Sequence, residues 1–195
     1  ALGFPLERAV ACQQVHGTHV AVVTEKDAGK GIYSLEDAIP ETDGMVTDCP
    51  QLPLLISFAD CVPILLVDPK RGAIGAVHAG WRGSVGKILP QALEVMEEAF
   101  GTAPRDVMAG IGPSIGPCCY EVSQEVADRA AAYPSCLKPH GTGHYLLDLW
   151  KLNTLELMEA GVPREQIFRA DCCTSCHRDR FFSYRAEKGK TGRLY

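Results

Sequence analysis

The sequence predicts an α/β (α+β) fold, a single domain in which mixed β-sheets are covered by helices. The segment LPLLISFADCVPILLVD, interrupted at Asp60, Cys61 and Pro63, and the run GAIGAVHAG lack polar alternation, which is typical of strands covered on both faces of a sheet. After Ser84 the apolar residues instead recur at helical spacing. A chain of 195 residues is long enough to bury one substantial core, so residues 1–195 are expected to form one domain.

Each remaining segment has a local signal. ACQQVHGTHVAVVTE predicts two short strands around a turn at Gly17, and the polar segment 26–44 predicts a surface loop. The helix expected over 84–100 ends at Gly101, with a kink at Pro90. DVMAGIG predicts a strand, whereas EVSQEVADRAAAY and LDLWKLNTLELMEAG predict helices.

Composition excludes several classes of protein. The net charge is −5 and basic residues are scattered, so a nucleic-acid partner is not expected. No apolar run reaches membrane-spanning length, and ALGFPLERAV lacks the features of a secretory signal. Nine cysteines in a chain of this size and hydrophobic content do not indicate a disulfide framework. We therefore expect reduced thiols and a cytoplasmic location.

Polar side chains at the ends of predicted strands form the first candidate site. QVHGTH carries His16 and His19, the segment ADC carries Asp60 and Cys61, and an apolar run ends on His78. Two imidazoles and a thiolate suit a borderline-soft ion such as zinc, and three protein ligands leave one tetrahedral position open. Their separations match no short metal motif, so a site at His16, Cys61 and His78 is a hypothesis based on residue type and placement.

The C-terminal DCCTSCH offers further ligand patterns. Cys173-Thr-Ser-Cys176-His177 matches the C-x-x-C-H pattern of covalent haem attachment, but nothing indicates export. A structural zinc site at Cys172, Cys173, Cys176 and His177 lacks a second ligand pair, so buried or half-buried thiols at a strand end are favoured.

The loop GPSIGPCCYEV has several glycine and proline breaks and is expected to be rigid scaffolding before a helix. We interpret the adjacent Cys118 and Cys119 as packing residues, and His140 and His144 as solvated. Arg82 follows His78 at the start of a helix and is the arginine best placed to meet an anionic substrate group. Arg185 and Arg193 lie in aromatic or glycine-rich surroundings, and Arg193 is expected to be a solvated surface residue.

Six segments together give a family resemblance: QVHG, DGMVTD, ADCVPILLVDP, AVHAGWRG, GPSIGPCCYEV and FFSYRAEKGKTGR. They resemble the laccase-domain family of purine nucleoside phosphorylases, whose members are also described as multicopper polyphenol oxidases and peptidoglycan editing factors. The resemblance implies phosphorolysis of adenosine, inosine and methylthioadenosine, with adenosine deamination beside it. It also implies a metal triad at His16, Cys61 and His78, with purine nucleoside and phosphate as substrates.

The chain departs from the family pattern in two ways. Family members usually carry further residues before QVHG and a last strand after the position of Tyr195, so the chain is expected to lack these N-terminal and C-terminal segments. In addition, Ala186 stands where the family commonly has a second arginine.

These observations predict a zinc enzyme in which Cys61, His78, Asp60 and Arg82 are the catalytic candidates. Arg82 is expected to hold phosphate, and Asp60 to orient a ligand or protonate the base. A copper-dependent polyphenol oxidase (laccase) is one alternative, since two histidines and a cysteine resemble a blue-copper site, although the chain has six histidines and no H-x-H. A metal-free cysteine hydrolase or amidase acting on peptidoglycan precursors, with Cys61 as nucleophile and His78 as base, is another. No exposed apolar stripe recommends a partner-binding module.

Overall fold

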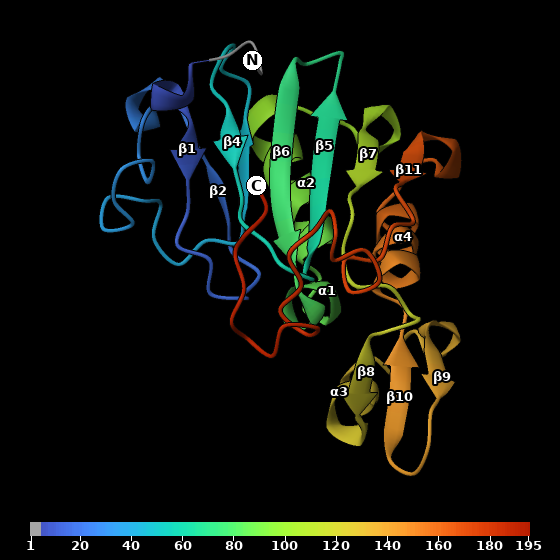
Figure 1. Cartoon of the computed structure of the whole chain (residues 1–195). Helices are drawn as coiled ribbons and strands as arrows, with labels where there is room; N and C mark the ends of the chain where they lie inside the picture. Colours follow the sequence, from blue (N-terminus) through green and yellow to red (C-terminus); the bar gives the residue numbers. More distant parts are fainter. Residues whose placement is uncertain (1–4) are drawn as a thin grey trace.

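The computed structural model describes residues 5–195 and is built around a six-stranded mixed sheet (Figure 1). Its strand order is β11-β7-β5-β6-β3-β2. The two outer pairs, β2 with β3 and β7 with β11, are parallel, and the inner pairs are antiparallel. The strands are β2 (Val20–Val22), β3 (Gly44–Thr47), β5 (Val62–Asp68), β6 (Ala73–Ala79), β7 (Met108–Ile111) and β11 (Ile167–Arg169).

Two smaller sheets complete the architecture and confirm the predicted mixed α/β class. β1 (Val10–Ala11) pairs in parallel with β4 (Leu54–Leu55). A three-stranded antiparallel sheet has the order β8-β10-β9, from β8 (Glu121–Ser123), β10 (His144–Leu147) and β9 (Leu137–Pro139). In Figure 1 this sheet lies at the end of the central sheet that carries α1. The two strand pieces predicted around Gly17 therefore belong to different sheets.

The β5–β6 hairpin sets the position of two candidate ligands. Its register pairs Val62 with Ala79 and Pro63 with His78, so Cys61, directly before β5, lies at the same end as His78. At the opposite end, the Asp68 carboxylate accepts hydrogen bonds from the backbone N–H groups of Lys70 and Arg71 at 2.9 and 3.2 Å. This side chain therefore closes the turn over residues 69–72.

The helices are α1 (Trp81–Val85), α2 (Ile88–Phe100), α3 (Gln124–Arg129) and α4 (Leu149–Glu159). The predicted apolar stripe of α2 is buried against the sheet, but the continuous helix expected over 84–100 is wrong. Lys87 has a φ of 69°, which breaks the helix between α1 and α2. Pro90 consequently falls in the first turn of α2, where its missing N–H has no intrahelical partner to lose and no kink is required.

Two further predictions about helices have different outcomes. The helix expected over 147–161 is confirmed by α4, whereas the one over 121–133 is confirmed only over α3. Glu121–Ser123 pair with β10 instead, so the loop GPSIGPCCYEV leads into a strand, and α3 begins only at Gln124. Within residues 5–195, no helix is both long and apolar enough to cross a membrane.

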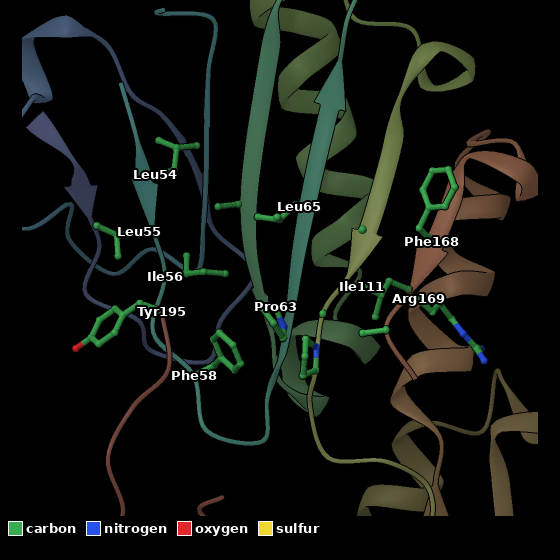
Figure 2. Close-up of a pocket in the computed structure, with 15 residues that line it drawn as sticks. Leu54, Leu55, Ile56, Phe58, Pro63, Leu65, Ile111, Phe168, Arg169 and Tyr195 are labelled. Carbon is green, nitrogen blue, oxygen red and sulfur yellow. The ribbon is translucent and has the colours of Figure 1, made fainter. Parts of the chain in front are cut away.

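The apolar strands predicted a central sheet that is covered on both faces, but part of its second face is exposed. The β1–β4 layer covers the part of the second face where Met45 and Ala76 are buried. Beyond that layer, Leu65 on β5 and Phe168 on β11 are 57% and 60% exposed. They line an apolar groove of about 490 Å³ that also includes Tyr195, and Figure 2 shows Leu65 and Phe168 on their strands and Tyr195 on the C-terminal segment. Continuous apolar character therefore did not require full burial here.

Candidate metal centre

His16, Cys61 and His78 meet at one end of the central sheet. His16 lies in the loop before β2, Cys61 directly precedes β5, and His78 is near the end of β6. The ligand atoms of the three residues all lie within 4.8 Å of one another. The two imidazole rings meet edge to face, with centroids 4.8 Å apart and an angle of 82° between their planes. The structure thus brings together three residues that are far apart in the sequence.

Asp43 fixes the orientation of this cluster, although sequence reasoning missed it. Its buried carboxylate accepts hydrogen bonds from the backbone N–H groups of Val15, His16 and Gly17 at 3.1, 2.9 and 2.7 Å. Its Oδ1 also lies 2.9 Å from Nδ1 of His78. A carboxylate on the outer nitrogen of a ligating histidine selects the tautomer and orients the ring. The available signal was an acidic residue directly before the apolar strand in DGMVTD.

The charges within the cluster favour a thiolate. Burial alone would raise the pKa of the Cys61 thiol, but hydrogen bonds and charge from His16 and His78 outweigh it and lower this pKa to about 6. Burial alone would lower the pKa of His78, but Asp43 and Cys61 raise it to about 9. The thiolate is the form of cysteine that acts as nucleophile and as metal ligand.

Because Gly80 has no side chain, Cys61 and His16 can lie close to its backbone. A Cβ atom at this position would lie 3.1 Å from Cys61 Sγ and 3.3 Å from His16 Cδ2. Because such contacts are tighter than ordinary van der Waals contacts, a side chain would displace the sulfur or the ring. The glycine before Trp81 in HAGWRG is therefore explained by close approach to two candidate ligands.

The three residues open onto a pocket of about 530 Å³. Three arginines line this pocket: Arg82, Arg185 and Arg193. Arg193 is exposed, in agreement with the expected solvation, and it also lines the pocket. The guanidinium carbon of Arg82 lies 4.4 Å from the ring centroid of Trp81, and that of Arg185 lies 5.3 Å from the ring centroid of Tyr120. Cationic groups at a pocket suit an anionic ligand.

Asp60 ties a distant loop to the wall of the pocket. It is only 8% exposed, and its φ of 85° places it in the left-handed region. Its Oδ1 accepts a hydrogen bond from the Thr174 hydroxyl at 2.6 Å, and its Oδ2 accepts one from the backbone N–H of Arg185 at 2.7 Å. Both carboxylate oxygens are thus engaged in holding the chain that carries Arg185.

The other histidines lie outside the cluster. His19 Nδ1 is 3.0 Å from the Thr42 hydroxyl, and it is not among the clustered ligand atoms. His140 and His144 are more than half exposed, in agreement with the expected solvation, and both lie near the Glu121 carboxylate.

The cysteines of the C-terminal pattern are arranged differently from the prediction. Cys118, interpreted as a packing residue, is exposed, and it lies with Cys119, Cys173 and Cys176 in a second cluster. Cys172 and His177 are not part of that cluster. The second ligand pair missing from the sequence pattern is therefore supplied by the loop before β8, which the fold brings alongside.

Comparison with known proteins places the chain in a family. A family model described as multi-copper polyphenol oxidoreductase laccase matches residues 1–195. The chain belongs to this laccase family. A laccase-family relative from Geobacillus stearothermophilus, named purine nucleoside phosphorylase YlmD, is 43% identical over 198 residues, covering 99% of this chain and 72% of that protein. A relative from an unknown prokaryotic organism, named adenosine deaminase RL5, is 35% identical over 199 residues, covering 100% of this chain and 76% of that protein.

Solved structures of laccase-family members share the fold. The crystal structure of YlmD from Geobacillus stearothermophilus superposes with a TM-score of 0.95 at 43% identity, covering 98% of this chain and 73% of that one. The Bacillus licheniformis hypothetical protein YfiH also gives a TM-score of 0.95, at 38% identity, covering 98% of this chain and 74% of that one. The mixed α/β architecture is thus the architecture of the laccase family.

Proposed function

We propose that this chain is a zinc-dependent enzyme that phosphorolyses purine nucleosides and also deaminates adenosine. Its substrates would be adenosine, inosine or methylthioadenosine, with phosphate as co-substrate. The observation that carries the proposal is the His16–Cys61–His78 cluster at an arginine-lined pocket. Relatives named purine nucleoside phosphorylase and adenosine deaminase support this choice of chemistry.

The donor set fits zinc, held by His16, Cys61 and His78. His78 would keep its Nδ1 proton, donated to Asp43, and give up the proton on Nε2 to bind the ion, and the low pKa of Cys61 favours the thiolate. When bound, zinc supplies a Lewis acid that can polarise a substrate oxygen or activate water. The chain itself contributes the preset orientation of its ligands through the buried carboxylate of Asp43.

The arginines are assigned to phosphate. Arg82 would accept the anion with its planar guanidinium group, while Arg185 and Arg193 add positive charge on the same pocket. Asp60 acts as a positioning residue in this proposal, because both of its oxygens already accept hydrogen bonds from the loop of Arg185. These contacts favour the orienting role over protonation of the departing base.

The aromatic residues of the pocket are assigned to the purine. Trp81, Tyr120 and Tyr184 line it, and their rings offer flat apolar surfaces on which a purine can stack. All nine cysteines are free, which suits a reducing compartment, and we place the enzyme in the cytoplasm. We also propose that residues 1–195 form one domain.

Steady-state assays of adenosine and inosine with phosphate test the proposal. Cys61→Ala should abolish turnover, whereas Arg82→Ala should raise the KM for phosphate about 10- to 100-fold, as expected for loss of a hydrogen bond to a charged group. Arg105→Ala is the matched control, because Arg105 is exposed and does not line the pocket. No turnover by the metal-loaded chain, or full activity of Cys61→Ala, would reject the proposal.

A metal-free cysteine hydrolase is a second candidate, and the lowered pKa of Cys61 favours it. In that mechanism His78 would be the base for the Cys61 thiol. Elemental analysis separates the two: stoichiometric zinc, whose removal by a chelator also removes activity, excludes the hydrolase. The same measurement addresses the copper oxidase that the family's name suggests, because copper in place of zinc would favour oxidation of phenols.

A further inference from the structure

A second group of sulfur atoms lies apart from the three candidate ligands of the pocket. Cys118 and Cys119 belong to the turn before β8, and Cys173 and Cys176 to the loop after β11. All four sulfurs lie within 4.8 Å of one another. Cys176 Sγ is 3.6 Å from Cys118 Sγ and 3.4 Å from Cys119 Sγ. Two segments distant in the sequence thus bring their thiols together, beside backbone hydrogen bonds between Ser114 and the loop of Cys173.

The spacing of these sulfurs suits a tetrahedral ion. Zinc binds cysteine sulfur at about 2.3 Å, so four tetrahedral sulfurs lie about 3.8 Å apart. Cys173 and Cys176 form a C-x-x-C turn, in which the backbone N–H of Cys176 donates to the carbonyl of Cys173 at 3.2 Å. Two ligands from one turn and two from a second segment are typical of structural zinc sites.

A backbone donor lies beside one sulfur of the cluster. The N–H of Gly116 donates to Cys173 Sγ at 3.2 Å. A Cβ at Gly116 would lie 2.6 Å from a carbon of Trp150, so the close packing at this donor requires glycine. A backbone N–H aimed at a ligand sulfur is the kind of outer contact that orients metal ligands.

We propose that Cys118, Cys119, Cys173 and Cys176 bind a structural zinc ion, separate from the one proposed at the pocket. Four cysteines fill the coordination of zinc and leave no position for substrate, so the ion would have no direct part in catalysis. Binding requires the thiols to lose their protons and is therefore linked to pH and to folding.

The ion would brace one wall of the pocket. Thr174, between the two loop cysteines, donates to Asp60, and the same chain continues to Tyr184 and Arg185 at the pocket. Tyr120, directly after Cys119 in the other cysteine-bearing segment, also lines the pocket. Linking the two loops through a metal would hold these side chains in place without a disulfide.

Metal analysis of the Cys61→Ala chain tests the proposal, because this variant leaves all four sulfurs of the second cluster intact. We expect one zinc per chain, with X-ray absorption showing four sulfur ligands at about 2.3 Å and no nitrogen ligand. Cys176→Ser in the same background should lose this zinc. Cys172→Ser is the matched control, since Cys172 adjoins Cys173 but lies outside the cluster, and it should retain the zinc.

The outcomes separate this proposal from the proposed function. The unsubstituted chain should hold two zinc ions; if the pocket binds none, it should hold one that Cys61→Ala retains and Cys176→Ser removes. A Cys61→Ala chain that holds no metal after incubation with zinc would overturn the proposal. Retention of this zinc by a folded Cys176→Ser variant would also overturn it. A mass two hydrogens lower, with two thiols lost, would also overturn it in favour of a disulfide. Should Cys176→Ser fail to fold, the absorption spectrum of Cys61→Ala decides alone.

Discussion

Oδ1 of Asp43 lies 2.9 Å from Nδ1 of His78, in a contact where the two side chains are 0% and 3% exposed. The same carboxylate accepts the backbone N–H groups of residues 15–17. One buried side chain therefore orients a candidate ligand on β6 and the loop that carries another. Its contribution can be measured without altering any candidate ligand.

Asp43→Asn should weaken metal binding about 10- to 100-fold, the usual cost of losing an outer-sphere carboxylate. Asparagine keeps the size of the side chain but removes the charge that holds the His78 ring. Competition with a chelator measures the change. Asp37→Asn is the control, because Asp37 accepts a backbone N–H in the same loop but lies in an exposed position. Equal affinity of the two variants would contradict the role assigned to Asp43.

Gly80→Ala should reduce both metal content and turnover. The added Cβ would lie 3.1 Å from Cys61 Sγ and 3.3 Å from His16 Cδ2, so the ligands must separate to admit it. Gly110→Ala serves as the comparison, because a Cβ at that strand position meets no atom of residues 5–195 within 4 Å. Elemental analysis and circular dichroism of both variants distinguish loss of the site from loss of the fold. Full metal occupancy in Gly80→Ala would show that the close approach is unimportant.

Asp60→Asn should raise the KM for phosphate more than it lowers kcat. Asparagine tolerates the left-handed backbone of this position, but it cannot accept from both Thr174 and Arg185. A donor left unpaired in the pocket wall costs about 1–3 kcal/mol, which should loosen the loop of Arg185. Thr174→Ser retains the hydroxyl donor and should behave like the parent chain. A loss confined to kcat would instead support a proton-transfer role for Asp60.

Stability should depend on pH through Glu156. This side chain is fully buried, and within residues 5–195 neither of its oxygens accepts a hydrogen bond, although Lys87 Nζ lies 3.5 Å away. Burial raises its pKa from 4.5 to about 7. Between these values the folded chain binds more protons than the unfolded chain, so the free energy of unfolding falls as pH rises from about 4.5 to about 7.

Glu156→Gln should remove this contribution, which is on the order of 1–3 kcal/mol. Urea unfolding at pH values below and above this interval measures the difference. Glu159→Gln is the control, since Glu159 lies on the same helix, is 58% exposed and has a lowered pKa. A stability curve of Glu156→Gln as steep as that of the parent would refute the assignment.

Local patterns in the sequence predicted the elements whose partners lie nearby. The run GAIGAVHAG predicted β6 because it is short, apolar and bounded by glycines, and the segment 147–161 predicted α4 because its apolar residues recur at helical spacing. The break at Lys87 could not be predicted, because its left-handed backbone conformation carries no apolar signal. The strand at Glu121–Ser123 could not be predicted either, because it depends on pairing with β10, which is remote in the sequence.

The candidate ligands could be proposed from their chemical type, whereas their supporting residues could not. In the sequence Asp43 is one polar residue at the end of a predicted loop, and only the fold brings it to His78 and to the backbone of His16. The sequence suggests only that Cys118 packs beside Cys119, whereas in the fold the loop after β11 lies next to both. Both depend on contacts between segments that are remote in the sequence, which periodicity does not encode.

The β5–β6 hairpin makes the pocket sensitive to the length of a turn at the far end of the sheet. Side chains alternate between the two faces of a strand, so a slip of one residue in the pairing of Pro63 with His78 would turn the imidazole away from Cys61. A single insertion within residues 69–72 that shifts this pairing would thus disable the protein while every metal-binding and substrate-facing residue stayed in the sequence. The register of this hairpin is therefore a requirement of the site in addition to the ligands themselves.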